Sequence, residues 1–140
     1  MKTEVHFKSA AFNSTEPRDY FINPSCFGDD VCWWLIKELR ARGIETSEAP
    51  DQEDFGWFVT FKVDGAEHNF VIGFQLGGYF VLEGQSLGRE GQWLGWLERT
   101  GVVRGLLGRR QRDVQAAAVE AVNAALLSVP DVRDLEWVER

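Results

Sequence analysis

The fold is decided by residues 27–40, which read Phe27-Gly28-Asp29-Asp30-Val31-Cys32-Trp33-Trp34-Leu35-Ile36-Lys37-Glu38-Leu39-Arg40. Large apolar side chains recur in this stretch every four residues, at Val31, Leu35 and Leu39. That spacing is typical of an amphipathic helix and not of an alternating strand. The stretch therefore predicts a helix with one apolar face, and the rest of the chain must supply the surface that covers this face.

Both ends of this helix carry the expected signals. Gly28 precedes it, and Asp29 and Asp30 place negative charge at the positive end of the helix dipole. Gly43 follows the last basic residues and supplies a stop. Trp33 and Trp34 are adjacent, so they point about 100° apart on a helix. We expect one indole to join the edge of the core and the other to lie toward solvent.

Residues 57–75 carry the clearest strand signal. Apolar and polar side chains alternate from Trp57 to Val63, and Asp64-Gly65 is a preferred two-residue hairpin turn. A turn at these two residues predicts the register, in which Lys62 faces Glu67, Phe61 faces His68, Val59 faces Phe70 and Trp57 faces Ile72. One face then holds large apolar pairs and the other an opposite-charge pair. A slip of one residue would destroy both, which supports this register.

The remaining elements are shorter or less regular. Strands are predicted at 3–12, 44–49, 79–83 (after a turn at Gly77-Gly78) and 132–138, and a second helix at 113–129, from Asp113 as cap to Pro130. Residues 13–26 are expected to form a loop and 48–54 an acidic connection. The order β-α-β-β-β-β-α-β predicts a single α+β domain over 1–140. In it, an antiparallel sheet of about five to six strands carries two packed helices.

Residues 84–112 differ in composition from the rest of the chain. They contain seven glycines, with Trp93, Trp96 and several leucines between them. We expect a glycine-punctuated connection with one or two short helical turns, acting as a lid over the second sheet face at Phe58, Val71, Phe80 and Leu82. The alternative is a surface that contacts a partner, a nucleic acid or a membrane, because the tryptophans are interleaved with arginines.

The charge balance limits the classes of function. Fifteen basic and 22 acidic residues give a net charge of −7, which argues against non-specific nucleic-acid binding as the main role. Six arginines and two glutamates give residues 84–112 a net charge of +4 and leave −11 for the rest. No apolar run approaches the roughly 20 residues of a membrane span. The segment from Met1 to His6 lacks an apolar signal core, so we expect a cytoplasmic protein with reduced cysteines.

Few residues suggest chemistry. Cys26 comes just before a helix start, where the dipole can lower a thiol pKa, and Cys32 lies on the helix stripe. Two structural thiols are the preferred interpretation, because neither histidine is near in sequence and there is no C-x-x-C pair. His68 falls on the apolar ladder and is expected to be structural, and His6 falls on an outer face. The spacing fits no zinc site, so no catalytic residue, cofactor or metal is predicted.

An acidic run is the other candidate feature. Glu45, Glu48, Asp51, Glu53 and Asp54 follow one another without a basic residue between them, and they lack the spacing of a calcium loop. The run is either a solvated connection or an anionic patch for a basic partner.

Three motifs carry a resemblance: Asn23-Pro24-Ser25-Cys26-Phe27-Gly28-Asp29-Asp30, Asp54-Phe55-Gly56-Trp57 and Gly105-Leu106-Leu107-Gly108-Arg109-Arg110. Together they resemble a pattern of small bacterial α+β proteins that has no established activity. The resemblance implies a bacterial, cytoplasmic α+β domain and transfers no site residue.

Two classes of function follow. The first is a small acidic binding protein, such as an inhibitor or immunity-type partner of a basic protein, with Asp51, Glu53, Asp54, Trp93 and Trp96 as its binding residues. The second is an enzyme or small-ligand binder with a pocket between helix and sheet, near Cys26 and Trp57. The first is preferred, because small size and acidity fit it and no set of catalytic residues is apparent.

Overall fold

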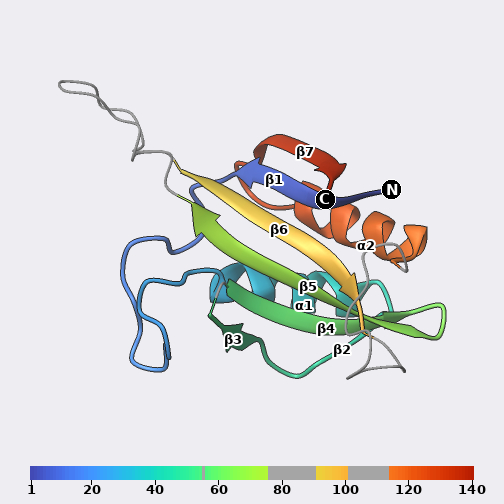
Figure 1. Cartoon of the computed structure of the whole chain (residues 1–140), viewed down its shortest axis with the longest axis horizontal. Helices are drawn as coiled ribbons and strands as arrows, with labels where there is room; N and C mark the ends of the chain where they lie inside the picture. The colour runs from blue at the N-terminus through green and yellow to red at the C-terminus, as the bar shows by residue number, and fades with distance from the viewer. Residues whose placement is uncertain (55, 76–90, 101–113) are drawn as a thin grey trace.

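The computed structural model describes residues 1–54, 56–75, 91–100 and 114–140. In chain order these form β1 (Lys2–Lys8), α1 (Asp29–Ala41), β2 (Glu45–Thr46), β3 (Asp51–Glu53), β4 (Gly56–Val63), β5 (Ala66–Gln75), β6 (Gln92–Arg99), α2 (Ala116–Leu127) and β7 (Arg133–Glu139). The strands build one antiparallel sheet in the order β2-β4-β5-β6-β1-β7, and β3 also pairs with β4. Both helices lie on the same face of this sheet (Figure 1). The predicted α+β class is confirmed.

Helix α1 begins and ends as its sequence predicts. Asp29 and Asp30 form an acidic first turn after Gly28, whose φ is 143°. A Cβ atom at Gly28 would lie 2.9 Å from the carbonyl oxygen of Ile72, so the chain can pass this close to β5 only without a side chain. At the other end Gly43 adopts a φ of 82° and donates its N–H to the carbonyl of Arg40 at 2.9 Å.

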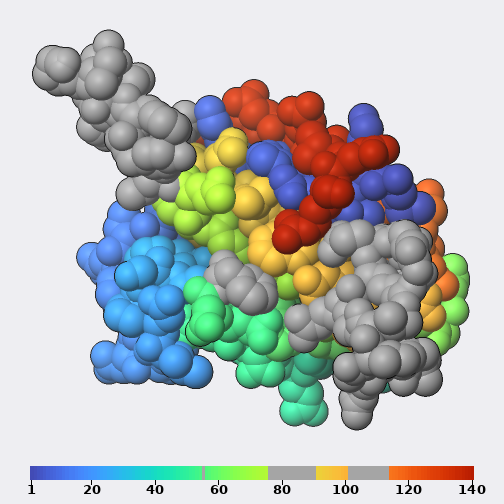
Figure 2. Space-filling model, viewed as in Figure 1, coloured from blue at the N-terminus to red at the C-terminus, as the bar shows by residue number. Residues whose placement is uncertain are grey.

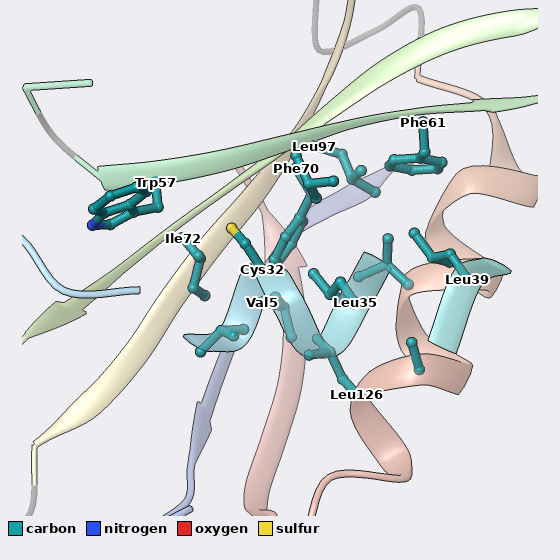
Figure 3. Packing of buried hydrophobic residues seen from close by; sticks show 14 of the residues in the cluster. Val5, Cys32, Leu35, Leu39, Trp57, Phe61, Phe70, Ile72, Leu97 and Leu126 are labelled. Carbon is teal, nitrogen blue, oxygen red and sulfur yellow. The ribbon is translucent and has the colours of Figure 1, made fainter. Parts of the chain in front are cut away.

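The apolar face of α1 packs on the sheet. Leu35 and Leu39 have no exposed surface, and they point toward Phe61 of β4 and Phe70 of β5, which are also buried (Figure 3). Helix α2 closes the same core with Leu126 and its small alanines. The predicted burial of the α1 stripe against the β4–β5 hairpin is therefore confirmed.

The adjacent tryptophans of α1 separate as expected. The Trp34 indole is partly buried, and its Nε1 donates a hydrogen bond to the carbonyl oxygen of Ala125 in α2 at 3.1 Å. Trp33 is 48% exposed. Trp34 therefore joins the two helices at the edge of the core.

The hairpin register is confirmed at every predicted pair. Strand β4 pairs with β5 so that Lys62 faces Glu67, Phe61 faces His68, Val59 faces Phe70 and Trp57 faces Ile72. Asp64 and Gly65 have φ values of 49° and 78°, as a two-residue turn of the primed type requires.

The prediction of helical turns and a lid between 84 and 112 is wrong for residues 92–99. They form β6, which lies inside the sheet between β5 and β1. Gly95 shows why the composition misled, because a Cβ there would lie 2.5 Å from Cζ of Phe70 and 2.8 Å from the carbonyl oxygen of Val71. The glycine makes room for a core phenylalanine in a strand and does not mark a loop.

Other boundaries shift modestly. The first strand ends at Lys8 and not at residue 12, and β3 forms inside the predicted acidic connection. The second strand shortens to β2, and α2 occupies the middle of the predicted 113–129 helix. The expected strand at 79–83, the Gly77-Gly78 turn, the Asp113 cap and the side chains of Phe80 and Leu82 lie outside the described residues. Within those residues, neither helix has the length and apolar character needed to cross a bilayer.

Replacing Leu35 with alanine should lower the free energy of unfolding by about 2–5 kcal/mol, because the change leaves a cavity under the sheet. The matched control is Trp33→Ala on the exposed face of the same helix, which should cost about 1 kcal/mol or less. Chemical denaturation of the two variants measures both. Equal midpoints for Leu35→Ala and the wild type would remove the role assigned to α1.

Candidate functional site

The loop that precedes α1 is fastened to β3 by the side-chain amide of Gln52. Its Oε1 accepts hydrogen bonds from the backbone N–H groups of Ile22 and Asn23, at 2.5 and 3.2 Å. Its Nε2 donates to the carbonyl oxygen of Asn23 at 2.9 Å. The amide thus pairs with two backbone N–H groups and one backbone carbonyl of the same short segment, as a neighbouring strand would. The loop is therefore held in one position.

A second fastening lies at the carbonyl oxygen of Cys26. It accepts a hydrogen bond from Nε1 of Trp57 at 2.9 Å and a longer one from Nε2 of Gln52 at 3.4 Å. Gln52 and Trp57 are opposite each other in the β3–β4 pairing, so their side chains leave the sheet on the same side. This geometry joins β3, β4 and the start of α1 at one point.

Two apolar side chains are exposed on this fastened loop. Ile22 is 83% exposed and Tyr20 is 55% exposed. The Tyr20 ring still packs edge-on against Phe21 and Trp57, with centroids 5.4 and 6.2 Å apart, and its hydroxyl donates to Oδ2 of Asp29. Since the loop backbone and the Tyr20 ring are both held, this apolar surface is presented to solvent in a defined position.

Carboxylates lie next to this loop, on β3 and directly after it. Asp51 and Glu53 are opposite Phe58 and Gly56, so they point to the sheet face opposite α1 and α2, while Gln52 points to the face that these helices cover. Asp51 and Asp54 are exposed and Glu53 is partly exposed. Figure 2 shows the blue loop beside the green residues of β3. We refer to Asp51, Glu53 and Asp54, with Tyr20 and Ile22, as the acidic edge.

A pocket of about 280 Å³ adjoins the acidic edge. It lies between the loop before α1, Asp54 and strands β5 and β6. Its walls are formed by Asn23, Ser25, Cys26, Phe27, Asp54, Gly73, Phe74, Gln75, Leu94 and Trp96. The sequence suggested a pocket between helix and sheet near Cys26 and Trp57. The pocket beside β5 and β6 includes Cys26, whereas Trp57 is not among its lining residues.

The two tryptophans predicted to bind a partner lie in β6. Trp93 faces the helices and is fully buried, so its indole is part of the core. Trp96 lies on the other face and is 8% exposed. The guanidinium of Arg140 stacks 4.0 Å from the centre of the Trp96 ring, and Nε1 of Trp96 donates to Glu98 at 2.9 Å. Of the two, Trp96 alone lines the pocket.

Both cysteines are buried free thiols. Burial raises the pKa of the Cys26 thiol, with a smaller contribution from the nearby Asp54 carboxylate, and a hydrogen bond with Gln52 opposes this only in part. Burial likewise raises the pKa of Cys32 well above its usual value. Cys26 therefore does not gain the lowered pKa that a helix start can provide, and the structural interpretation of the thiols is favoured.

The histidines have structural partners. His68 is buried and stacks on Phe61, its Nδ1 lies 3.3 Å from the carbonyl oxygen of Ala66, and its Nε2 accepts the backbone N–H of Gln115 at 3.2 Å. This bond links β5 to the residue that caps α2. His6 contacts Glu4 and Gln92 on the sheet face opposite α1 and α2. In the described ranges, no three histidine, cysteine or carboxylate side chains gather as a metal site would require.

Sequence reasoning found the acidic residues and missed the group that organises them. Gln52 is the one uncharged residue in the Asp51-Gln52-Glu53-Asp54 run. This difference from its neighbours is the sequence feature that could have pointed to its structural role. In the loop before α1, Phe21 is buried in the core, whereas Tyr20 and Ile22 are exposed. Comparison of the chain with protein-family models, with curated proteins and with solved structures finds no match.

In the native protein, both thiols should react slowly with a thiol-specific reagent such as DTNB, because burial shields them and their raised pKa disfavours the thiolate. In denaturant, protein prepared without oxidant should titrate two thiols. Rapid reaction of one thiol in the native state, abolished by Cys26→Ser, would support a reactive cysteine instead.

Stability should fall as the pH decreases below about 6.5, the pKa of a histidine in the unfolded chain. Burial lowers the pKa of His68 in the folded protein, helped by the nearby charge of Arg99, so between the two pKa values the unfolded state binds more protons. NMR titration of the imidazole in a His6→Gln background isolates the His68 signal. A folded midpoint at or above the midpoint in urea would contradict this assignment.

Proposed function

We propose that this protein is a small acidic binding protein that engages a basic protein partner through the acidic edge. The observation that carries the proposal is Ile22, an aliphatic side chain 83% exposed on a backbone fastened by Gln52, beside the carboxylates of β3. On a loosely held loop, an exposed apolar side chain would not indicate a binding surface. On a held loop it is an ordered surface whose burial by a partner costs little further conformational entropy.

The chemistry of the edge indicates the partner. Residues 45–54 hold five carboxylates and no basic residue, within a chain of net charge −7. Such a surface repels phosphate and attracts lysine and arginine, and this complementarity raises association rates and selects against acidic partners. Exposed aromatic and aliphatic anchors with a charged surround are the usual composition of protein interfaces.

Occupation of a target, as an inhibitor or immunity-type partner does, suits this arrangement better than catalysis. The thiols are buried and protonated, and neither histidine has a hydrogen bond with a hydroxyl or thiol side chain in the residues that the structure describes. A nucleophile with an adjacent base would be the expected sign of an acyl- or group-transfer enzyme.

A charge-reversal experiment tests the surface. A partner captured from the native host is purified, and its affinity is measured for the wild type and for the triple variant Asp51→Lys, Glu53→Lys, Asp54→Lys. We expect the triple variant to lose at least about tenfold in affinity, and wild-type binding to weaken steeply as salt screens the charges over about 8 Å at physiological strength. The matched control reverses two basic residues, Arg109→Glu and Arg110→Glu, and should leave binding largely intact. Lost binding in this control with retained binding in the triple variant would identify an anionic partner and overturn the proposal.

The apolar part of the surface is tested separately. Ile22→Ser should weaken partner binding without changing the free energy of unfolding, because the side chain is exposed in the unbound protein. Leu127→Ser, at a residue 57% exposed at the end of α2, is the matched control and should bind normally. Equal losses in both variants would show that Ile22 has no specific role.

A further inference from the structure

The pocket beside the acidic edge is small. Its volume of about 280 Å³ lies just below the roughly 300–1,000 Å³ that small-molecule sites occupy. A dinucleotide or other large cofactor would not be enclosed by it. Because Asp54 belongs both to the pocket wall and to the acidic edge, anything that docks on the edge meets the pocket mouth.

The walls divide into two kinds of surface. One is apolar and largely aromatic, from Phe27, Phe74, Leu94 and Trp96, and the other is polar, from Asn23, Ser25, Gln75 and Asp54. Among the described residues that line the pocket, Asp54 carries the one formal charge. Aromatic faces beside a single carboxylate are the complement of a flat, delocalised cation on an apolar stem.

The same chemistry already operates on this face of the sheet. The guanidinium of Arg140 stacks 4.0 Å from the centre of the Trp96 ring, while its Nη1 lies 3.3 Å from a carboxylate oxygen of Glu4. An arginine held between an indole and a carboxylate is therefore an arrangement that this surface supports.

We propose that the pocket receives an arginine side chain of the basic partner, with the guanidinium against Asp54 and the stem along Phe27 and Leu94. This inference rests on the proposed function and names the group that the acidic edge recognises. Arginine is favoured over lysine because its planar head stacks on rings and pairs with carboxylates, whereas an ammonium is compact and strongly hydrated.

The test uses N-acetyl-L-arginine methylamide as the probe, titrated into the 15N-labelled full chain and followed by NMR. The shifts should concentrate at the amides of Ser25 and Gly73 and at the Trp96 indole. The corresponding citrulline compound, nearly isosteric and neutral, should produce none at equal concentration. Asp54→Asn should weaken the arginine probe by about fivefold to tenfold, since it removes the charge and keeps the shape. Glu120→Gln, at an exposed carboxylate of α2 outside the acidic edge, is the matched control and should leave affinity unchanged.

A second pair of variants tests the position. Ser25 is exposed at the pocket wall and its side chain makes no hydrogen bond among the described residues, so Ser25→Trp should obstruct the pocket and abolish probe binding. Ser25→Ala should bind as the wild type does. Equal binding of the arginine, lysine and citrulline compounds, shifts located elsewhere, or no shifts at all would overturn the assignment.

The outcomes separate this inference from the proposed function. If the triple lysine variant loses the partner while Ser25→Trp retains it and the arginine probe does not bind, the pocket assignment fails and the acidic edge remains the interface. If the probe binds in the pocket but partner affinity is insensitive to the triple variant, the acidic edge fails as the interface. The arginine of the partner is assigned only when the probe, Ser25→Trp and the triple variant all respond.

Discussion

Burial of one face of α1 against the β4–β5 hairpin is the constraint on which the rest of the structure depends. Leu35 and Leu39 lose all contact with solvent there, against two large rings, Phe61 and Phe70. The helix can lie so close to β5 only because Gly28 brings the chain against the carbonyl of Ile72 without a Cβ. The path of the preceding loop, past the beginning of β4, follows from this contact.

That path creates the candidate surface. A loop forced to run beside β3 and β4 carries backbone groups that need partners, and the side chains of Gln52 and Trp57 supply them at Ile22, Asn23 and Cys26. The same hydrogen bonds that complete the fold therefore hold Ile22 outward, next to the carboxylates of β3. Structure and proposed recognition share these bonds, so a change at Gln52 would affect both.

The two faces of the sheet are stabilised in different ways. The helix face is a closely packed apolar layer. The other face is organised by polar and aromatic contacts within the sheet, including the 2.6 Å hydrogen bond from Thr60 to the buried Asn69 and the stack of Arg140 on Trp96. Satisfied polar pairs help to keep the large side chains of this face in place. The pocket forms where β5 and β6 meet the loop before α1.

Elements whose signals lie within a few residues of one another follow from the sequence. The four-residue repeat of α1, its glycine stop and the β4–β5 register were all predictable, because neighbours in the chain supply the period and the turn. Only the tertiary structure decided that residues 92–99 are a strand, since Gly95 is required by Phe70, a residue distant in sequence. The hydrogen bond from the Ile22 N–H to the Gln52 side chain joins positions 30 residues apart, so no local sequence pattern predicts it. The carboxylates of the acidic edge could be identified from the sequence. Their spatial neighbours could not, because only tertiary packing brings Tyr20, Ile22 and the pocket beside them.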